Sequence, residues 1–538
     1  MKKKGILNSI VVLIISQCIV KVFGLVYKLY LANKQGFGDS GNAIYNSGYQ
    51  IYVLLLTVSS IGVPNAVAKL ISEKYYKGDK LEVAQILKSS LLVFSIIGII
   101  FTLLLAIFAG VISEELLNIN EAKYSLVALA PAILNVCLIS VYRGFYNGTQ
   151  NVKITAKSQT LEQIFKTVFT ILLVEFSFFI TNANTVAMAT IANFATTLAT
   201  LCSLVYLHKK NKLEGIKAKF NGRDVKKILK ISIPISLSSV LASLNKNIDS
   251  MTVVRFLKKS ISEREAKIQY GILSGKVDVL ASVPVSFVIA IATTVITMVS
   301  MLNAQGKKSS LNNIVKTYIL FTILIVLPCS IGMVAFSDKI LILLFGNNNG
   351  FNLLKICAIS LFFISLEQII HAVLQGIGLV FVPTASLSVG VVIKTLLNII
   401  LIKIPESSLV IGGTNGACIA TLVCHMVACS ISFFVMKKKL KIKLEISKFL
   451  LKPIGASCIM LMSLYSSYFF LKGILVENIA IILAVLVAIV MYAISVFLLN
   501  VFNEEELNMI PFVSNFAIFN KNIRKNKEKR RILHNFGE

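Results

Sequence analysis

The 538-residue chain has no tryptophan, only four histidines and few charged side chains, since Asp, Glu, Lys and Arg make up 15% of it. Its nine cysteines are scattered, with no Cys-x-x-Cys spacing and no histidine cluster beside them. These absences argue against a disulfide framework, a zinc site and a haem site. The connections between apolar segments are short, so no sizeable polar domain is left to carry soluble catalysis.

Apolar sequence is abundant: 56% of the residues are hydrophobic and the mean hydropathy is +0.80, above what soluble domains reach. Nothing alternates like a barrel strand, and lipid leaves the backbone no partners outside a helix. We therefore predict an all-α polytopic membrane protein with 14 transmembrane helices, each able to cross about 30 Å of hydrocarbon. The predicted limits are 7–32, 43–72, 84–112, 122–148, 155–181, 185–207, 227–257, 270–303, 313–336, 353–377, 381–403, 411–436, 449–472 and 477–502.

A net charge of +29 raises the question of nucleic acid, but the basic residues form short blocks between apolar runs, which are typical orientation signals. Blocks such as "MKKK", "HKKNKLEGIKAKFNGRDVKK" and the tail "KNIRKNKEKRRILHNFGE" place both termini in the cytoplasm. The loop "KKSISEREAKIQ", with four basic residues on the outer side, is an exception. The apolar start lacks a signal-peptide cleavage site, so we interpret it as an uncleaved first helix.

A weak internal repeat divides the chain. A shift of 228 residues superposes 143–175 on 371–403 and matches Lys166 with Lys394. We predict two six-helix lobes in parallel repeat, 1–210 and 211–437, since six spans separate the copies. Two additional helices at 438–502 and a basic cytoplasmic tail at 503–538 follow.

Ionisable residues inside spans are costly and by default mark a pathway or a binding site. Two polar stripes recur every four residues, one at 158–170 around Lys166 and one formed by Glu367, His371 and Gln375. Such stripes must face a bundle interior or a wet cavity, although polar contacts between helices are an alternative role. Arg143 and Arg255 lie near predicted span ends, where snorkelling to the interface is an equally good explanation.

The ionisable residues deep inside the predicted spans include more cations than anions, and they are spread over several spans of both lobes. This excess of positive charge suits a polyanionic ligand such as phosphate. The predicted substrate-binding residues are Lys21, Gly24, Lys28, Arg143, Lys166, Lys246, Arg255, Lys276 and Lys394. The predicted gating or coupling residues are Glu162, Asp249, Glu367 and His371. No catalytic or metal-ligating residue is predicted.

Several linked motifs resemble one family of membrane transporters. They include "KVFGLVYKLYLA" at 21–32, "RGFYNGTQNVKITAKSQTLEQIFKTV" at 143–168, "YGILSGKVDVLASVPVSFVIAIATTVITMVS" at 270–300 and "VLQGIGLVFVPTASLSVGVVIKTLLNIIL" at 373–401. The chain is similar over about 1–437 to the oligosaccharide flippases related to stage V sporulation protein B and the Gram-positive lipid II flippases. These belong to the multidrug, oligosaccharidyl-lipid and polysaccharide exporter superfamily.

The resemblance implies two six-helix bundles in a V around a cationic cavity, with the two last helices forming a groove for a lipid tail. Lys21 falls where the lipid II flippases have a functional arginine, and their second first-helix arginine falls near Tyr27, beside Lys28. Their second-helix arginine has no basic counterpart, because the region near Leu55 is apolar.

The resulting hypothesis is a flippase of the bacterial cytoplasmic membrane that moves an undecaprenyl-diphosphate-linked saccharide, lipid II or a related cell-wall or spore-cortex precursor, by alternating access. No bond of the cargo changes, so no enzyme activity and no cofactor are predicted. A coupling cation, sodium or a proton, or the membrane potential would drive it, and other cell-wall synthesis proteins are candidate partners. The alternatives are a multidrug/cation antiporter of the same superfamily and a membrane glycosyltransferase or polysaccharide polymerase.

Overall fold

The computed structural model describes residues 19–60, 62–75, 77–211, 219–405, 411–442 and 445–501, and within these ranges the regular structure is helical. The predicted all-α fold is confirmed. The helices are 19–33, α2 (Gly38–Ser60), α3 (Val63–Tyr75), α4 (Lys80–Ile107), α5 (Ala109–Val111), the π-helix η1 (Ile112–Leu116), α6 (Ala122–Gly148), α7 (Val152–Thr181), α8 (Thr185–Lys209), α9 (Gly222–Leu257), α10 (Glu263–Ile272), the π-helix η2 (Leu273–Val277), α11 (Asp278–Ala304), α12 (Lys308–Ala335), α13 (Ser337–Phe345), α14 (Phe351–Gly376), α15 (Phe381–Leu401), α16 (Gly413–Leu440), the π-helix η3 (Ser447–Leu451), α17 (Lys452–Lys472) and α18 (Glu477–Leu498).

Eleven helical stretches in the described part of the chain are long and apolar enough to cross a membrane. The other three predicted spans correspond to 19–33, α2 and α9, which are helical but are not among those eleven. The total of 14 therefore stays a prediction, as does the cytoplasmic position of the termini, which lie outside the described residues.

Helix ends follow local chemistry. Asp79 and Asn184 cap α4 and α8, because their side chains accept hydrogen bonds from the backbone N–H groups three residues later. Ser262 caps α10 in the same way. The helical stretch that corresponds to the predicted span 270–303 therefore begins earlier, at Glu263. At the end of α7, Asn182 adopts the left-handed conformation that terminates many helices.

The predicted span 43–72 is wrong as a single helix, since α2 ends at Ser60 and α3 begins at Val63. Gly62 lies between them, and a Cβ there would be 2.2 Å from the backbone oxygen of Ser232. Only glycine permits this approach to α9. Pro64 then lies in the first turn of α3, where its missing N–H has no helical partner to lose.

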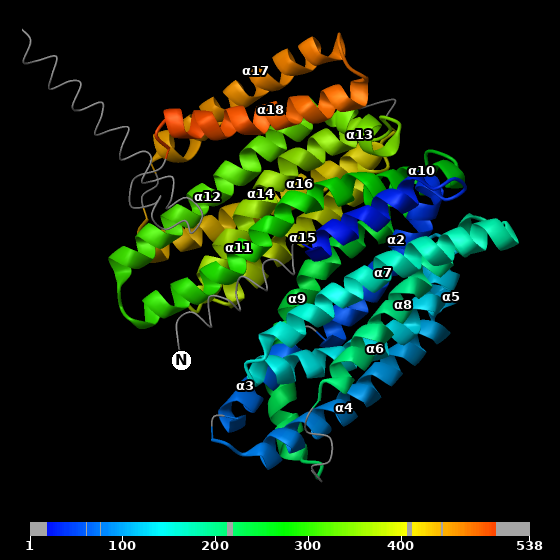
Figure 1. Ribbon diagram of the computed structural model, residues 1–538, viewed down its shortest axis with the longest axis vertical. Coiled ribbons are helices and arrows are strands. Elements are labelled where there is room, and N and C mark those ends of the chain that lie inside the picture. The colour runs from blue at the N-terminus through cyan, green and yellow to red at the C-terminus, as the bar shows by residue number, and fades with distance from the viewer. Residues whose placement is uncertain are drawn as a thin grey trace, which may run out of the picture.

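The same helix pairs pack together in both halves of the chain (Figure 1). In the first half α6 packs on α4 and α8, and α8 packs on α7; in the second, α14 packs on α12 and α16, and α16 packs on α15. We call the helices from 19–33 to α8 the N-terminal lobe and those from α9 to α16 the C-terminal lobe. The sequence boundaries at 210 and 437 remain predictions.

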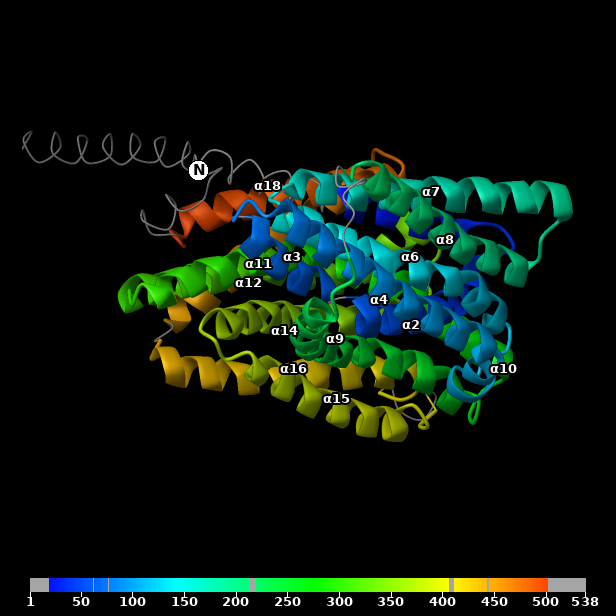
Figure 2. The ribbon, with the colours of Figure 1, turned by 90° about the horizontal axis from the view of Figure 1, so that it is seen from below.

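Helix α9 connects the lobes, because it packs on α2, α3 and α4 as well as on α15 and α16. Figure 2 shows α14, α15 and α16 layered on one side of it and the N-terminal helices on the other. Helices α17 and α18 pack on each other, and the pair lies against α12 and α13 at the edge of the molecule. Their role as a lipid-tail groove stays a prediction.

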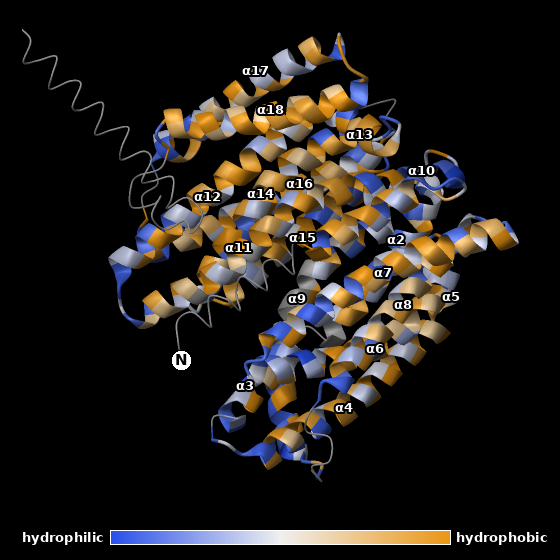
Figure 3. Ribbon diagram, viewed as in Figure 1, coloured by the Kyte–Doolittle hydropathy of each residue, from blue (hydrophilic) through white to orange (hydrophobic). Residues whose placement is uncertain are grey.

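Most of the helical ribbon is apolar, and hydrophilic residues gather at helix ends and connections and in short stretches within the helices (Figure 3). On α7, Leu172, Phe176 and Phe179 are exposed. The opposite stripe of that helix, which contains Lys166 and Thr170, is buried. An exposed apolar face with a buried polar stripe fits a helix surrounded by lipid.

Candidate functional site

Lys166 of α7 is buried in the N-terminal lobe, with 5% of its surface exposed. Its ammonium lies 4.0 Å from the ring centre of Tyr49 and 5.0 Å from that of Tyr27. Tyr45 supports both rings, since it stacks on Tyr49 and its hydroxyl lies 3.4 Å from the Tyr27 hydroxyl. No carboxylate of the described residues lies within ion-pair distance of Lys166. Within the described part of the chain this ammonium contacts aromatic faces, which stabilise a cation by about 0.5–2 kcal/mol.

The same face of α7 packs against the helix at 19–33. The hydroxyl of Thr167 donates to the backbone oxygen of Phe23 at 3.1 Å. A Cβ at Gly24 would be 3.5 Å from the side chain of Gln163, so the two helices are in contact there. Lys21 is exposed and Lys28 is half-buried on this neighbouring helix.

Glu162 of α7, a predicted gating or coupling residue, contacts a residue of another helix. Glu162 lies one turn from Lys166, but its carboxylate accepts a hydrogen bond of 2.6 Å from Arg143 on α6. The Arg143 guanidinium also donates to the hydroxyl of Ser158 at 3.0 Å. Glu162 therefore neutralises Arg143, and Lys166 has no carboxylate partner among the described residues.

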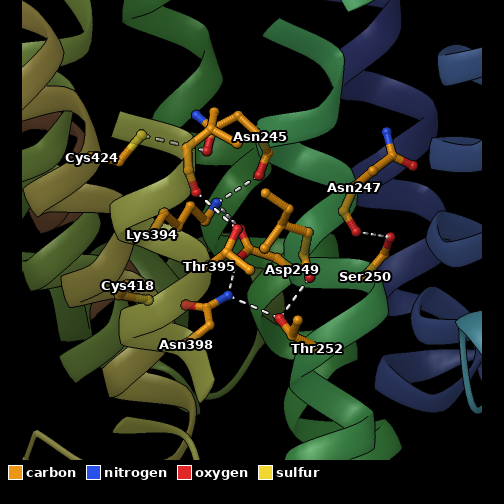
Figure 4. Close-up of polar contacts among 12 residues, drawn as sticks. Asn245, Asn247, Asp249, Ser250, Thr252, Lys394, Thr395, Asn398, Cys418 and Cys424 are labelled. Carbon is orange, nitrogen blue, oxygen red and sulfur yellow. Dashed lines mark hydrogen bonds and ion pairs between the residues drawn. The ribbon is translucent and has the colours of Figure 1, made fainter. Parts of the chain in front are cut away.

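Lys394 of α15, the repeat partner of Lys166, has a different environment (Figure 4). It is 1% exposed, and its ammonium lies 2.6 Å from a carboxylate oxygen of Asp249 on α9. It also donates to the backbone oxygen of Asn245 at 2.7 Å. Asn398, one turn further along, donates to the other Asp249 oxygen at 3.1 Å and to Thr252 at 2.9 Å. Lys394 is thus paired with a carboxylate and makes two hydrogen bonds.

Glu367 and His371 of α14 come together with a third ionisable residue that the sequence reading missed, His425 of α16. The Glu367 carboxylate is 2% exposed and lies 2.6 Å from Nδ1 of His425 and 3.7 Å from Nδ1 of His371. The far nitrogen of His425 lies 2.9 Å from the side-chain amide of Asn245. A continuous set of polar contacts therefore runs from His371 to Lys394.

Lys276 lies at the junction of the lobes and not beside the other buried lysines. Its ammonium is 2.9 Å from a carboxylate oxygen of Asp39, in the first turn of α2, and donates to the side chain of Asn347 at 3.2 Å. Gly275 is so close to α2 that a Cβ would be 2.5 Å from the side chain of Asn42. We call Asp39, Lys276 and Asn347 the inter-lobe latch.

Further contacts join the lobes at this same end of the bundle. Lys267 of α10 lies 2.8 Å from the carboxylate of Glu121, just before α6, and the Asn33 side chain donates to the backbone oxygen of Leu344 at 2.7 Å. Burial opposes the ionisation of Glu121, but the hydrogen bond from Lys267, a backbone hydrogen bond and the charge of Lys267 together outweigh it and hold the pKa of that carboxyl below its usual value. Lys267 belongs to the segment "KKSISEREAKIQ", whose basic residues are an exception to the predicted orientation. Ion pairs with Glu121 and Glu263 neutralise the charge of Lys267.

The model of the family described as "Polysaccharide biosynthesis protein" matches residues 6–303, more than half of the chain. The chain belongs to the polysaccharide biosynthesis protein family. A second model, MatE, matches residues 276–400, so both models include part of the C-terminal lobe.

Two curated proteins of Bacillus subtilis (strain 168) are similar to this family member. Stage V sporulation protein B is 24% identical over 534 residues, covering 96% of this chain and 100% of the relative. Lipid II flippase MurJ is 25% identical over 458 residues, covering 80% of this chain and 82% of the relative.

Solved structures agree on the fold. A lipid II flippase MurJ in an inward closed conformation matches with a TM-score of 0.70 at 18% identity, covering 91% of this chain and 99% of that one. An inward-facing multidrug transporter of the MATE family matches with a TM-score of 0.64 at 14% identity, covering 80% and 98%. This polysaccharide biosynthesis family member is a multi-pass membrane protein of the flippase and transporter type. The relatives whose names state a role are a flippase and a multidrug transporter, and none of these is named as an enzyme. The family expected from the sequence motifs is confirmed.

The other residues predicted for this transporter do not join one cluster. Arg255 is exposed near the end of α9, as snorkelling would require. The side chain of Lys246 lies outside the part of the chain whose side chains the structure describes. The roles of all the predicted site residues remain predictions.

The tyrosines around Lys166 were not predicted from the sequence, although their spacing could have indicated them. Tyr45, Tyr49 and Tyr52 recur at helical spacing on α2, and the structure groups them on one side of that helix. His425 could have been found in the same way, since it is an ionisable residue inside an apolar run.

Proposed function

We propose that the chain moves a polyprenyl-diphosphate-linked saccharide, lipid II or a related cell-wall or spore-cortex precursor, across the bacterial cytoplasmic membrane. The observation that carries this proposal is Lys166, a buried ammonium with no carboxylate among the described residues. Burying an uncompensated charge is costly, so a buried cation that is retained without an anion suits an anionic ligand. A diphosphate supplies oxygens for charge-assisted hydrogen bonds with lysine.

Neighbouring groups extend this site. Lys21 and Lys28 lie on the helix that packs against α7, so they add positive charge on the same side of the N-terminal lobe. The buried hydroxyl of Thr170, one turn from Lys166, has no hydrogen-bond partner within the described residues. The diphosphate would bind here, while the lipid tail stays in the bilayer.

Movement of the cargo would follow from rocking of the two lobes around this site. The inter-lobe latch and the Glu121–Lys267 pair join the lobes at one end of the bundle. The latch would have to open for cargo to leave on that side, which the predicted orientation makes the outer one. Its closure in this structure is consistent with a state closed to the outside.

The chief rival is a multidrug/cation antiporter of the same superfamily, and the MatE match to residues 276–400 favours it. Such a transporter needs acidic groups able to accept a cationic drug. In the described residues, Asp249 is already paired with Lys394 and Glu162 with Arg143, and Glu367 lies between His371 and His425. The N-terminal lobe offers a cation, Lys166. The charge balance therefore favours an anionic cargo.

A depletion experiment tests the cargo. The gene is expressed in cells depleted of their own lipid II flippase, and growth is measured together with binding of a polyprenyl diphosphate to the purified protein. We expect the wild type to restore growth, and we expect Lys166→Gln to lose both rescue and diphosphate binding. Lys157→Gln, which removes an exposed lysine from the same helix, is the matched control and should retain both.

Normal rescue and binding by Lys166→Gln, combined with normal rescue by the double variant Lys21→Ala and Lys28→Ala, would overturn the diphosphate site. Absence of rescue by the wild type, with diphosphate binding intact, would point to another polyprenyl-linked glycan. Export of cationic dyes by the wild type, without diphosphate binding, would replace the proposal by the antiporter.

A further inference from the structure

Glu367 is a buried carboxylate with no lysine or arginine beside it among the described residues. The groups closest to it are His371 on its own helix and His425 on α16. If both imidazoles are neutral, the cluster has a net charge of −1 in the interior of a helix bundle. Such a charge is expensive unless a cation neutralises it.

The hydrogen bonds of His425 assign its proton. Its Nε2 lies 2.9 Å from Nδ2 of Asn245, an amide nitrogen that can only donate, so Nε2 accepts. The single proton of a neutral ring is then on Nδ1, which donates to Glu367 at 2.6 Å. His425 in this state satisfies one oxygen of the carboxylate.

His371 has the opposite arrangement. The hydroxyl of Ser386 donates to the backbone oxygen of Pro383, and the hydroxyl of Ser432 donates to Ser386. Nε2 of His371, 3.0 Å from the Ser432 oxygen, must therefore be the donor in that contact. The ring's Nδ1 then has a lone pair, and it faces the second oxygen of Glu367 at 3.7 Å. Two acceptors face each other, and a shared proton would convert their repulsion into a hydrogen bond.

We propose that Glu367, His371 and His425 form a proton-binding site, with the proton held between Nδ1 of His371 and the free Glu367 oxygen. The coupling role of this site rests on the proposed transport function; the binding of the proton does not. Binding makes the cluster neutral and draws the two side chains to hydrogen-bond distance. Histidine suits this task because its charge changes between about pH 5 and 8.

A proton fits this cluster better than sodium does. Hard cations prefer several oxygen ligands, and here one carboxylate is flanked by two imidazoles. The described residues contain no group of three or more His, Cys, Asp and Glu side chains arranged to hold a metal ion.

The site is connected to the rest of the C-terminal lobe through Asn245. The side chain of Asn245 contacts His425, while its backbone oxygen accepts from Lys394, which is paired with Asp249. Other titratable groups near the cluster are the thiols of Cys424 and Cys429 on α16. The described residues of α11 and α12, which also pack on α14, contribute no ion pair or hydrogen bond to Glu367, His371 or His425. Proton binding is thus transmitted to α9, the helix that contacts both lobes.

Infrared spectroscopy of the purified full chain in lipid nanodiscs tests proton binding directly. The wild type is titrated between about pH 5 and 8, and carboxyl and imidazolium bands are followed. We expect the titration of a buried carboxyl–imidazole pair, lost in Glu367→Gln and in His371→Asn. Glu115→Gln removes an exposed carboxylate and is the matched control that should retain it. An unchanged titration in both cluster variants would overturn the proton site.

Transport in proteoliposomes tests the coupling. With a polyprenyl-diphosphate saccharide as cargo, we expect an imposed pH gradient to drive wild-type movement, and Glu367→Gln to lose this drive by about tenfold while cargo still equilibrates at equal pH. Drive by a sodium gradient and none by a pH gradient would overturn the coupling. If the wild type moves no cargo under any condition, the proposed function fails, and the infrared titration still decides whether the proton binds.

Discussion

Lys166 and Lys394 occupy equivalent positions of two repeated helices and have opposite surroundings. In the N-terminal lobe the ammonium faces tyrosine rings and has no carboxylate partner among the described residues. In the C-terminal lobe it is paired with Asp249 and hydrogen-bonded to Asn245. The repeat has therefore kept the cation and changed what balances it.

The same shift of 228 residues aligns Asp249 of α9 with Lys21 of the helix at 19–33. Where the C-terminal lobe provides an acid to neutralise its lysine, the N-terminal lobe provides a second base. At this position the C-terminal lobe has an internal ion pair and the N-terminal lobe has two lysines.

Removing Asp249 gives the largest expected effect on this comparison. Asp249→Asn leaves the Lys394 ammonium buried without its anion, and breaking a buried ion pair costs about 3–5 kcal/mol. We expect a clear fall in thermal stability of the purified protein in detergent, measured by the temperature at which half of it aggregates. The double variant Asp249→Asn and Lys394→Met should recover most of the loss.

Lys166 is the control for that experiment. Lys166 has no carboxylate partner among the described residues, so Lys166→Met leaves no buried charge unpaired. The substitution should therefore leave the stability unchanged or raise it. If Lys166→Met and Lys394→Met destabilise the protein equally, the two lysines have equivalent environments and the contrast between the lobes is wrong.

The positions of the helices could be predicted from the sequence far better than the partners of the charged residues. The predicted span 122–148 coincides with α6, because the apolar run and its polar boundaries are local features. The burial of the stripe around Lys166 also followed from helical periodicity alone. The break at Gly62 did not, since it depends on the approach of Ser232, which is distant in sequence.

The partners depend on contacts between distant segments. Glu162 is one turn from Lys166, which favours a pair within the helix, but the structure pairs it with Arg143 of α6. Lys394 reaches Asp249 across 145 residues of sequence, and His425 reaches Asn245 across 180. Sequence periodicity predicts which face of a helix is polar, but the residues that this face contacts are determined by tertiary packing.

A charge reversal at Lys21 sharpens the comparison with a smaller effect. Lys21→Asp places in the N-terminal lobe the acid that its repeat position has in the C-terminal lobe. We expect diphosphate binding to fall by about tenfold, equivalent to about 1.4 kcal/mol, because a nearby carboxylate competes with the ligand for the cations. Lys21→Gln is the control, and its affinity should lie between those of Lys21→Asp and the wild type. Equal affinities for all three proteins would show that Lys21 does not belong to the site.

The smallest effect is expected at the rim, where the lobes meet through Glu121 and Lys267. This pair is partly exposed, and exposed ion pairs contribute below about 1 kcal/mol, so Glu121→Gln should change thermal stability little at neutral pH. Lys267 holds the pKa of Glu121 below its usual value, so the contribution of the pair is present above the ordinary glutamate range, around pH 4.5, and is lost as the pH falls through the lowered folded-state pKa. The small difference between wild type and Glu121→Gln should therefore vanish on acidification and be screened by salt. If Glu121→Gln lowers the thermal stability as much as Asp249→Asn does, then the Glu121–Lys267 pair, and not the buried Asp249–Lys394 pair, holds the C-terminal lobe in place.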